Sequence, residues 1–432
     1  MTLILVLGGL FLLLLLGVDI AFALAGLGTI MIVVGGFSPL IVPQGLLASM
    51  DNFILLAVPL FILMSQVLLK GGAGDDLFNA VQSWVGHWPG GLAVATILSC
   101  TIFASISGSS VATAATIGTV AIPAMIGRGY DRRFVYGLLA AGGTIGILIP
   151  PSIPMIVYGV VVEESILDLF LAGIVPGLML TVLFIGFSVL HARMSGRFEP
   201  LPRAGRAERL RTTKRALPTM VLGAVIILGI YLGVFTPTEA SGVGFVAALV
   251  ITLFVKRSLK AADLPAVAMD ALKTTVMVLF IIAGAKVFGQ AITLYRIPQD
   301  VTALVTETLT SPLLFIVAIC GLLLVMGCVL ETLSMMLLML PIIEPSLRGL
   351  AIDPIWFGVI FTMMIECALI TPPVGLNLFV IQAVANQSRP GGPPVEAGDV
   401  VSGVLPFLVL MLLAVIAVIL VPDLALTVPF HL

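Results

Sequence analysis

Two stretches of the chain place a proline pair beside small polar residues inside otherwise apolar sequence. GGTIGILIPPSIPMIVYG carries Pro150-Pro151 followed by Ser152, and ECALITPPVGLNLFVIQA carries Pro372-Pro373 preceded by Thr371. Because proline has no N–H and obstructs a continuous helix, each stretch predicts two half-helices separated by a break. A break frees carbonyl oxygens that can replace water around a small cation. The next half-helix offers N–H groups and a positive dipole to an anion. These residues therefore predict ion binding.

Each proline pair is preceded by an apolar segment that small polar residues interrupt. In CTIFASISGSSVATAATIGTVAIP the interruption is Ser107 to Ser110, and in LLLVMGCVLETLSMMLLMLPIIEP it lies between Gly327 and Thr332. Close helix packing is an alternative reason for small polar residues at such places. Non-helical backbone is tolerated at membrane depth where protein or a watery cavity satisfies it. We therefore interpret the segments at about 91–126 and 312–345 as re-entrant helical hairpins.

The elements that carry these residues must lie in a membrane. Of 432 residues, 60% are hydrophobic and 10% are charged, with a mean hydropathy of +1.24, whereas soluble chains carry about a quarter charged residues. Apolar runs of about 17–25 residues recur along the chain, which indicates a polytopic membrane protein. No GxxxxGK[ST], HExxH or CxxC pattern is present, so we expect no enzyme activity, no cofactor and no nucleic-acid partner. The four cysteines lie in apolar segments without disulfide or metal spacing, as packing residues do.

Basic residues set the expected orientation of the spans. Three clusters, Arg128 to Arg133, His191 to Arg215 and Lys256 to Lys260, become cytoplasmic together if both termini are periplasmic. Lys286 is left inside a span, where it can pair with Glu366 or extend towards the outer face. The expected spans are about 2–17, 19–35, 52–70, 133–160, 168–190, 217–235, 239–255, 272–290, 355–385 and 401–422.

The two halves of the chain repeat the same order of features. Asp131 and Asp353 each stand 19 residues before a proline pair, and GVDIAFALAG at 17–26 parallels FTPTEASGVG at 235–244. With the expected spans in this orientation, the first copy starts outside the membrane and the second starts in the cytoplasm. The two copies therefore form an inverted repeat, which is the signature of secondary transporters. The expected parts are a first repeat at 1–160 with a broken helix at 133–160, a linking span and basic cytoplasmic loop at 161–216, a second repeat at 217–385 with a broken helix at 355–385, and a C-terminal span at 386–432.

The pairing of SGSSVATAATIG with GGTIGILIPPSIPMIVYG, and of GCVLETL with LITPPVGLNLFV, resembles the large membrane subunit (DctM-type) of tripartite ATP-independent periplasmic (TRAP) transporters over essentially the whole chain. The resemblance implies an all-α polytopic membrane protein of the bacterial inner membrane, with an inverted structural repeat, two re-entrant helical hairpins and two broken helices. It implies sodium-coupled uptake of a small organic anion by an elevator mechanism. The anion would be a carboxylate such as a dicarboxylate, a keto acid or a sialic acid.

The same resemblance implies partners. These are a small four-helix TRAP membrane subunit and a periplasmic substrate-binding protein, besides membrane lipids, with Na+ as the coupling ion. The binding protein largely sets selectivity in this family, so the substrate stays open. A stand-alone divalent-anion/sodium symporter, which works without a binding protein, is the alternative.

Ligand positions are also implied by the resemblance. Substrate would lie near Ser109, Ser152 and Asn377. Gly142, Gly143 and Gly375 would let the facing hairpin tip approach closely. The first sodium site would consist of Ser107, Ser109, Ser110, Gly143, Thr144 and Pro150. The second would consist of Gly327, Glu331, Thr332, Glu366, Thr371, Pro373 and Gly375. Many of the ligands would be backbone carbonyls.

Overall fold

The computed structural model describes residues 2–196, 200–308, 311–328, 330–388 and 394–431. Within these ranges the regular structure is entirely helical, so the expected all-α class is confirmed. The helices are α1 Thr2–Leu15, α2 Ile20–Val34, α3 Ile41–Met50, α4 Ala57–Lys70, α5 Ala73–Val85, α6 Gly91–Ser107, α7 Ser110–Ile126, α8 Arg132–Thr144, α9 Ile153–Val162, α10 Ile166–Ser195, α11 Arg206–Tyr231, α12 Pro237–Val250, α13 Leu264–Leu294, α14 Ile297–Thr308, α15 Pro312–Met326, α16 Thr332–Gly349, α17 Pro354–Leu369, α18 Leu376–Gln387, α19 Ala397–Leu420 and α20 Asp423–His431.

Six helical segments of the described chain are long and apolar enough to cross a membrane: Phe53–Lys70, Ile166–Ser195, Arg206–Tyr231, Pro237–Val255, Ala261–Leu294 and Ala397–Leu420. The half-helices and most hairpin arms are shorter, although α16 has 18 residues. The 13 residues of α8, for example, rise about 20 Å, which is less than a hydrocarbon core of about 30 Å. Half-helices of this length would cross a membrane only in pairs, which would place each break at membrane depth.

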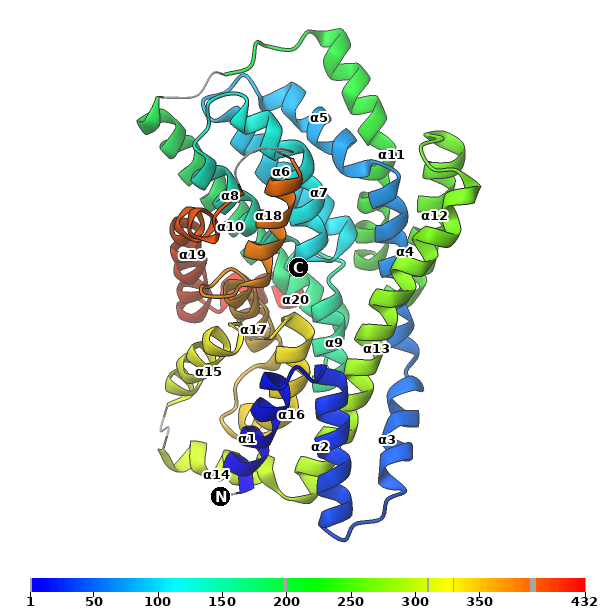
Figure 1. Ribbon diagram of the computed structural model, residues 1–432, viewed down its shortest axis with the longest axis vertical. Helices are drawn as coiled ribbons and strands as arrows, with labels where there is room; N and C mark the ends of the chain where they lie inside the picture. Colours follow the sequence, from blue (N-terminus) through cyan, green and yellow to red (C-terminus); the bar gives the residue numbers. More distant parts are fainter. Residues whose placement is uncertain (1, 197–199, 309–310, 329, 389–393, 432) are drawn as a thin grey trace.

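Helices end and restart at the expected tips and proline pairs; α6 and α7 pack against each other, whereas α15 packs against α17. Helices α6 and α7 meet at Ser107 to Ser110, and α15 and α16 meet between Gly327 and Glu331. Helix α8 is separated from α9, and α17 from α18, at the proline pairs. In Figure 1 the α6–α7 hairpin lies in the upper half of the molecule and the α15–α16 hairpin in the lower half. The peptide bonds Pro150-Pro151 and Pro372-Pro373 are both cis.

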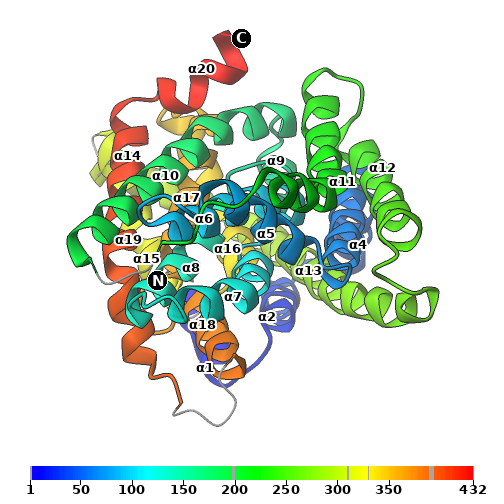
Figure 2. The same cartoon turned by 90° about the horizontal axis from the view of Figure 1, so that it is seen from above.

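The broken helices are interleaved with the hairpins. Helix α18 packs against α7 and α8, and α9 packs against α16 and α17. The second half of each broken helix therefore contacts the hairpin from the other half of the sequence. Seen along the long axis, α4, α11 and α12 lie together on one flank, while α10 and α19 lie on another (Figure 2).

The aspartates singled out from the sequence begin the two broken helices. Asp131 accepts a hydrogen bond from Phe134 N at 3.2 Å and so caps α8. Asp353 accepts from Trp356 N at 2.8 Å and caps α17. Both side chains satisfy N–H groups that the first helical turn leaves free. The matching positions of the two aspartates thus have matching structural roles.

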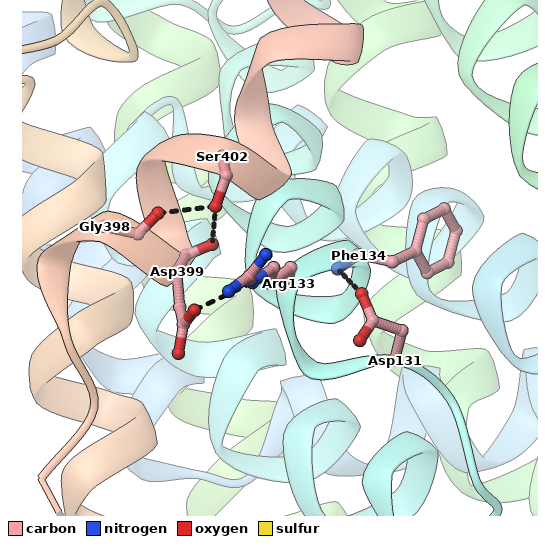
Figure 3. Close-up of polar contacts among 6 residues, drawn as sticks. All are labelled: Asp131, Arg133, Phe134, Gly398, Asp399 and Ser402. Carbon is pink, nitrogen blue, oxygen red and sulfur yellow. Dashed lines mark hydrogen bonds and ion pairs between the residues drawn. The ribbon is translucent and has the colours of Figure 1, made fainter.

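Helix α8 is held tightly against α19. A Cβ on Gly137 would lie 1.9 Å from Gly403 O, and one on Gly403 would lie 1.8 Å from Arg133 O. Only glycine permits two backbones to approach this closely. At the start of α8 the Arg133 Nε donates to Asp399 Oδ1 at 2.8 Å (Figure 3). Arg133 and Asp399 also line a cavity of about 870 Å³ together with His191.

Three expectations about boundaries need correction. The basic segment expected as a loop at 191–215 is largely helical, because α10 continues to Ser195 and α11 begins at Arg206. Helix α13 extends well beyond the expected span at 272–290. The short helices α3, α5, α14 and α20 were not expected. Hydropathy averaged over a span does not register amphipathic segments such as α5, which has polar residues on one side.

Candidate functional site

The first hairpin is pressed against the first break. A Cβ on Gly146 would lie 2.1 Å from the Cβ of Ala104, and one on Gly108 would lie 2.8 Å from Pro151 O. A Cβ on Gly143 would lie 2.9 Å from Ser110 O. The backbone of the α6–α7 tip and the backbone around the first break therefore touch directly. The expected role of Gly143 in close approach fits this geometry. The Cβ position of Gly142 lies 3.3 Å from Cys100 Sγ, which belongs to the middle of α6 and not to the hairpin tip.

The hydroxyl groups expected at the first sodium site and the substrate site have local partners. Ser107 Oγ lies 2.9 Å from Thr113 Oγ1. Ser109 Oγ accepts from Ala112 N at 3.3 Å and caps α7. Ser152 Oγ accepts from Met155 N at 3.3 Å and caps α9. The oxygen atoms of these serines keep further lone pairs, so capping leaves them able to contact an ion.

Thr144 is placed differently from the serines. Its hydroxyl donates to Ala141 O at 2.6 Å and lies 3.6 Å from the Met411 sulfur on α19. The side chain thus faces the α8–α19 interface, although Thr144 follows Gly143 directly. Pro150 is buried at the break itself.

The second hairpin approaches the second break through an equivalent contact. A Cβ on Gly327 would lie 2.2 Å from the Cβ of Ala368. Cys328 Sγ lies 3.8 Å from Pro372 O. Thr371 Oγ1 donates to Cys367 O at 2.7 Å, and the Thr332 side chain is buried.

Gly375 is required for a reason other than the expected one. Its φ is +52°, and a Cβ there would lie 3.0 Å from Leu369 O, within the same broken helix. Since side chains disfavour this region of φ, Gly375 allows the turn into α18 rather than the approach of the hairpin tip. Gly375 also provides no side-chain cap for α18.

Glu331 is the N-cap of α16. Its carboxylate accepts hydrogen bonds from Leu333 N at 3.1 Å and Ser334 N at 2.7 Å, and from Ser334 Oγ at 2.8 Å. The residue has the position in the second hairpin that Ser109 has in the first. It places a carboxylate where the first hairpin has a hydroxyl.

The two halves of the sequence meet in a buried polar junction. Asn377 Nδ2 on α18 donates to Ser110 Oγ on α7 at 2.6 Å and lies 3.3 Å from Ala140 O on α8. Glu366 on α17 lies beside the Ser110 side chain. Glu366 and Asn377 are 0% exposed. Glu366, expected with the second hairpin, therefore contacts the tip of the first.

Several atoms of this junction have no hydrogen-bond partner among the described residues. They are both carboxylate oxygens of Glu366 and the Oδ1 atom of Asn377. A buried acceptor without a donor is costly and is uncommon in folded proteins. Lys286 does not compensate Glu366, because its side chain is exposed on α13 and forms no ion pair within the described ranges.

The sequence reasoning missed the contacts made by Ala140 and Cys328. Ala140 contributes only its carbonyl oxygen, and Cys328 contributes its sulfur next to Pro372 O. Neither residue type indicates a role by itself. Their placement could be found only by pairing the hairpins with the breaks in three dimensions.

Comparison with known proteins identifies relatives of the whole chain. The family model "Tripartite ATP-independent periplasmic transporter, DctM component" matches residues 7–424. A C4-dicarboxylate TRAP transporter large permease protein DctM from Pseudomonas aeruginosa is 39% identical over 89% of this chain and 88% of its own length. An ectoine/5-hydroxyectoine TRAP transporter large permease protein from Ruegeria pomeroyi is 36% identical over 89% and 87%.

Two further relatives extend the comparison. An isethionate TRAP transporter permease protein DctMQ from Oleidesulfovibrio alaskensis is 34% identical over 94% of this chain and 63% of its own length. Among solved structures, the YdaH transporter of Alcanivorax borkumensis superposes with a TM-score of 0.61 at 13% identity, covering 89% of this chain and 88% of that one. This last likeness concerns the fold alone.

Proposed function

Because the chain belongs to the family of DctM components of tripartite ATP-independent periplasmic transporters, we propose that it couples the uptake of a small organic anion to the entry of sodium. Its role as a large permease subunit follows from the family. The sodium coupling, the substrate class and the mechanism are our proposal. The observation that carries it is the pair of hairpin–break contacts, Gly146 on Ala104 and Gly327 on Ala368.

Each contact brings free backbone groups of a hairpin tip to those of a broken helix. Interrupted helices at such places offer carbonyl oxygens in the geometry that sodium sites of secondary transporters use. We assign one sodium ion to the contact of Ser107, Ser109 and Ser110 with Gly143 and Pro150. The second is assigned to the contact of Gly327, Glu331 and Thr332 with Thr371 and Pro373.

The substrate anion is assigned to the space between these contacts. Helix α18 begins at Leu376 without a side-chain cap, so its first N–H groups and its positive dipole are available to a carboxylate. Ser109, Ser152 and Asn377 border this region. The relatives named for C4-dicarboxylates, ectoine and isethionate support a small charged organic solute.

The mechanism that fits this arrangement is an elevator. The hairpins and broken helices interleave into one block, while α2 and α4 pack against α13 and α12. Movement of the block against that flank would carry substrate and sodium across together. The inverted repeat of residues 1–160 and 217–385 would let the block pack against the flank in two ways, one open to each side of the membrane.

Two partner proteins complete the proposed transporter in the bacterial inner membrane. A periplasmic binding protein would deliver the anion, and a small membrane subunit would join the flank of the permease. The relative with the name DctMQ supports the second partner, because its chain extends well beyond the part that this chain matches. Both termini of the permease would be periplasmic.

Uptake into proteoliposomes tests the proposal. The chain is reconstituted with a small TRAP membrane subunit, and a TRAP periplasmic binding protein is added outside with its labelled solute, a C4-dicarboxylate, ectoine or sialic acid. We expect uptake only with an inward sodium gradient and the binding protein, and no requirement for ATP. Full-rate uptake without the binding protein would instead indicate a stand-alone symporter. Uptake that is independent of sodium would refute the coupling.

A further inference from the structure

We propose that the cavity at the start of α8 binds the headgroup of a phospholipid that carries both a phosphate and a primary ammonium group, as phosphatidylethanolamine does. The phosphate would lie on Arg132 and Arg133, and the ammonium group on Asp131 and Asp399. The length of α8 separates this cavity from the first break. The inference does not depend on the proposed sodium coupling.

The position of the cavity favours a membrane lipid as its occupant. The cavity of about 870 Å³ lies between the start of α8, the end of α10 and the first turn of α19. On α10, His191 forms a flat wall, because its ring is stacked on Phe134 with centroids 4.3 Å apart. Both Ile166–Ser195 and Ala397–Leu420 are long and apolar enough to span a membrane. Two such helices with ends at one place put the cavity at the boundary between hydrocarbon and headgroups.

Apolar side chains on the same two helices can contact the acyl chains. Met194, which lines the cavity, is 79% exposed, and Leu190, one turn earlier on α10, is 56% exposed. Helix α19 packs against α10 and exposes Leu405. A lipid whose headgroup occupies the cavity would cover part of this surface, and burial of apolar area stabilises its binding. A soluble ligand with the same headgroup would lack this contribution.

The cavity contains charges of both signs. Asp131 caps α8 with its Oδ2 atom, and Asp399 accepts from Arg133 Nε with its Oδ1 atom (Figure 3). Each aspartate keeps a second carboxylate oxygen for another donor. Arg132 forms no ion pair with the described residues. Arg133 keeps the Nη donors that its contact with Asp399 does not use.

This mixture of charges selects between headgroups. Arginine donors suit the phosphate that all phospholipids share. The two carboxylates disfavour additional negative charge and offer acceptors to N–H groups. A primary ammonium group is a compact charge with three donors, whereas a trimethylammonium group has no N–H donor and a glycerol headgroup has no positive charge. The headgroup that complements the cavity therefore combines a phosphate with a primary ammonium group.

Lipid binding to the purified permease tests the site without transport. The protein is delipidated in detergent, and native mass spectrometry measures the binding of phosphatidylethanolamine, phosphatidylcholine and phosphatidylglycerol with identical acyl chains. We expect phosphatidylethanolamine to bind about fivefold more tightly than the other two, because exposed ion pairs contribute modestly. Free phosphoethanolamine should compete only at much higher concentration. Competition as effective as that of the lipid would overturn the assignment to a membrane lipid.

Charge variants separate recognition from packing. Asp131→Asn with Asp399→Asn removes both carboxylates and keeps the cap of α8, since asparagine caps as well as aspartate. This double variant should lose the preference for phosphatidylethanolamine and bind phosphatidylglycerol at least as well. Arg132→Gln should weaken binding of all three lipids, because the phosphate is common to them. Arg206→Gln, at the exposed start of α11 and outside the cavity, is the control and should change nothing.

The outcomes distinguish this site from the proposed function. Equal affinity of the parent for the three lipids would overturn the inference. An unchanged preference in the double asparagine variant would also overturn it, because a merely structural role of the aspartates predicts no change of preferred lipid. If that variant is not recovered as a monodisperse protein, Arg132→Gln decides, and unchanged lipid binding there refutes the site. None of these results would alter the proposed sodium coupling.

Discussion

Both hairpin–break contacts combine a glycine–alanine contact with a proline pair, but they differ in how far their residues are buried. At the first, Pro150, Pro151 and Ser152 are all buried. At the second, Pro373 is exposed and Val374 is 41% exposed. The first contact is enclosed by neighbouring helices, whereas the second is open on one side.

The two contacts also differ in where their glycines lie. At the first, Gly146 of the broken-helix region meets Ala104 of the hairpin, and Gly108 of the hairpin meets Pro151 O. At the second, Gly327 of the hairpin meets Ala368 of the broken helix. The difference in enclosure suggests that the second contact has more freedom to open, because fewer buried neighbours oppose its movement.

The largest effect is expected from a methyl group placed in the enclosed contact. In Gly146→Ala the new Cβ would lie 2.1 Å from the Cβ and 2.9 Å from the Cα of Ala104, so backbone must shift. Overpacking costs about 1–3 kcal/mol, and we expect the midpoint of thermal unfolding to fall by about 1–3 °C. Gly186→Ala, where open space surrounds the new Cβ, is the control. Adding Ala104→Gly should restore part of the stability, because it removes the 2.1 Å contact and leaves the 2.9 Å contact with the Cα; no restoration would contradict the steric explanation.

The same substitution at the open contact should behave differently. Gly327→Ala places a Cβ 2.2 Å from that of Ala368, but the hairpin can yield towards its exposed side. We expect a smaller fall in unfolding midpoint than for Gly146→Ala and a strong loss of uptake, since closure of the hairpin is prevented. Ala368→Gly should restore uptake in the double variant. Equal destabilisation by both glycine substitutions would show that the contacts do not differ in freedom.

A smaller and more specific effect is expected from the two threonines. Thr371 lies at the open break, whereas the Thr144 hydroxyl is turned towards Met411. Thr371→Val should weaken apparent sodium affinity by about three- to tenfold, because one neutral oxygen contact contributes about 0.5–1.5 kcal/mol. Thr144→Val should change it little. Sodium titration of the unfolding midpoint measures both, and a larger effect at Thr144 would reverse the assignment.

Much of this architecture could be predicted from residue type and spacing. Proline pairs and glycine-serine tips act on the backbone directly, so the breaks at Pro150 and Pro372 and the hairpin tips near Ser109 and Gly327 appear where expected. The paired aspartates Asp131 and Asp353 were informative for the same reason, because capping is local.

The remaining features depend on which segments meet. Sequence grouped Glu366 with the second hairpin because it stands close to Thr371, but helix direction turns its side chain to Ser110 instead. Asn377 was expected at the substrate, and the structure shows its amide bonded between α7 and α8. Ala140 had no detectable signal, since its contribution is a carbonyl oxygen.

The smallest effect is expected where the first broken helix begins, at the ion pair of Arg133 with Asp399. Their side chains are 62% and 35% exposed, and exposed pairs contribute only about 0.2–1 kcal/mol. A double-mutant cycle of Arg133→Gln and Asp399→Asn should give a coupling energy in this range at low salt, and less in 1 M salt because charges are screened.

Gly403→Ala, on the same helix as Asp399, separates the two ways in which α8 and α19 are held. Its Cβ would lie 1.8 Å from Arg133 O, so it should destabilise the protein far more than loss of the ion pair. The enclosed character of the first break would then come from backbone contact between α8 and α19. The opposite result would be a coupling energy of the ion pair larger than the loss of unfolding free energy in Gly403→Ala. Charge, and not backbone contact, would then hold the first broken helix in place, and the difference between the two contacts would need an electrostatic explanation.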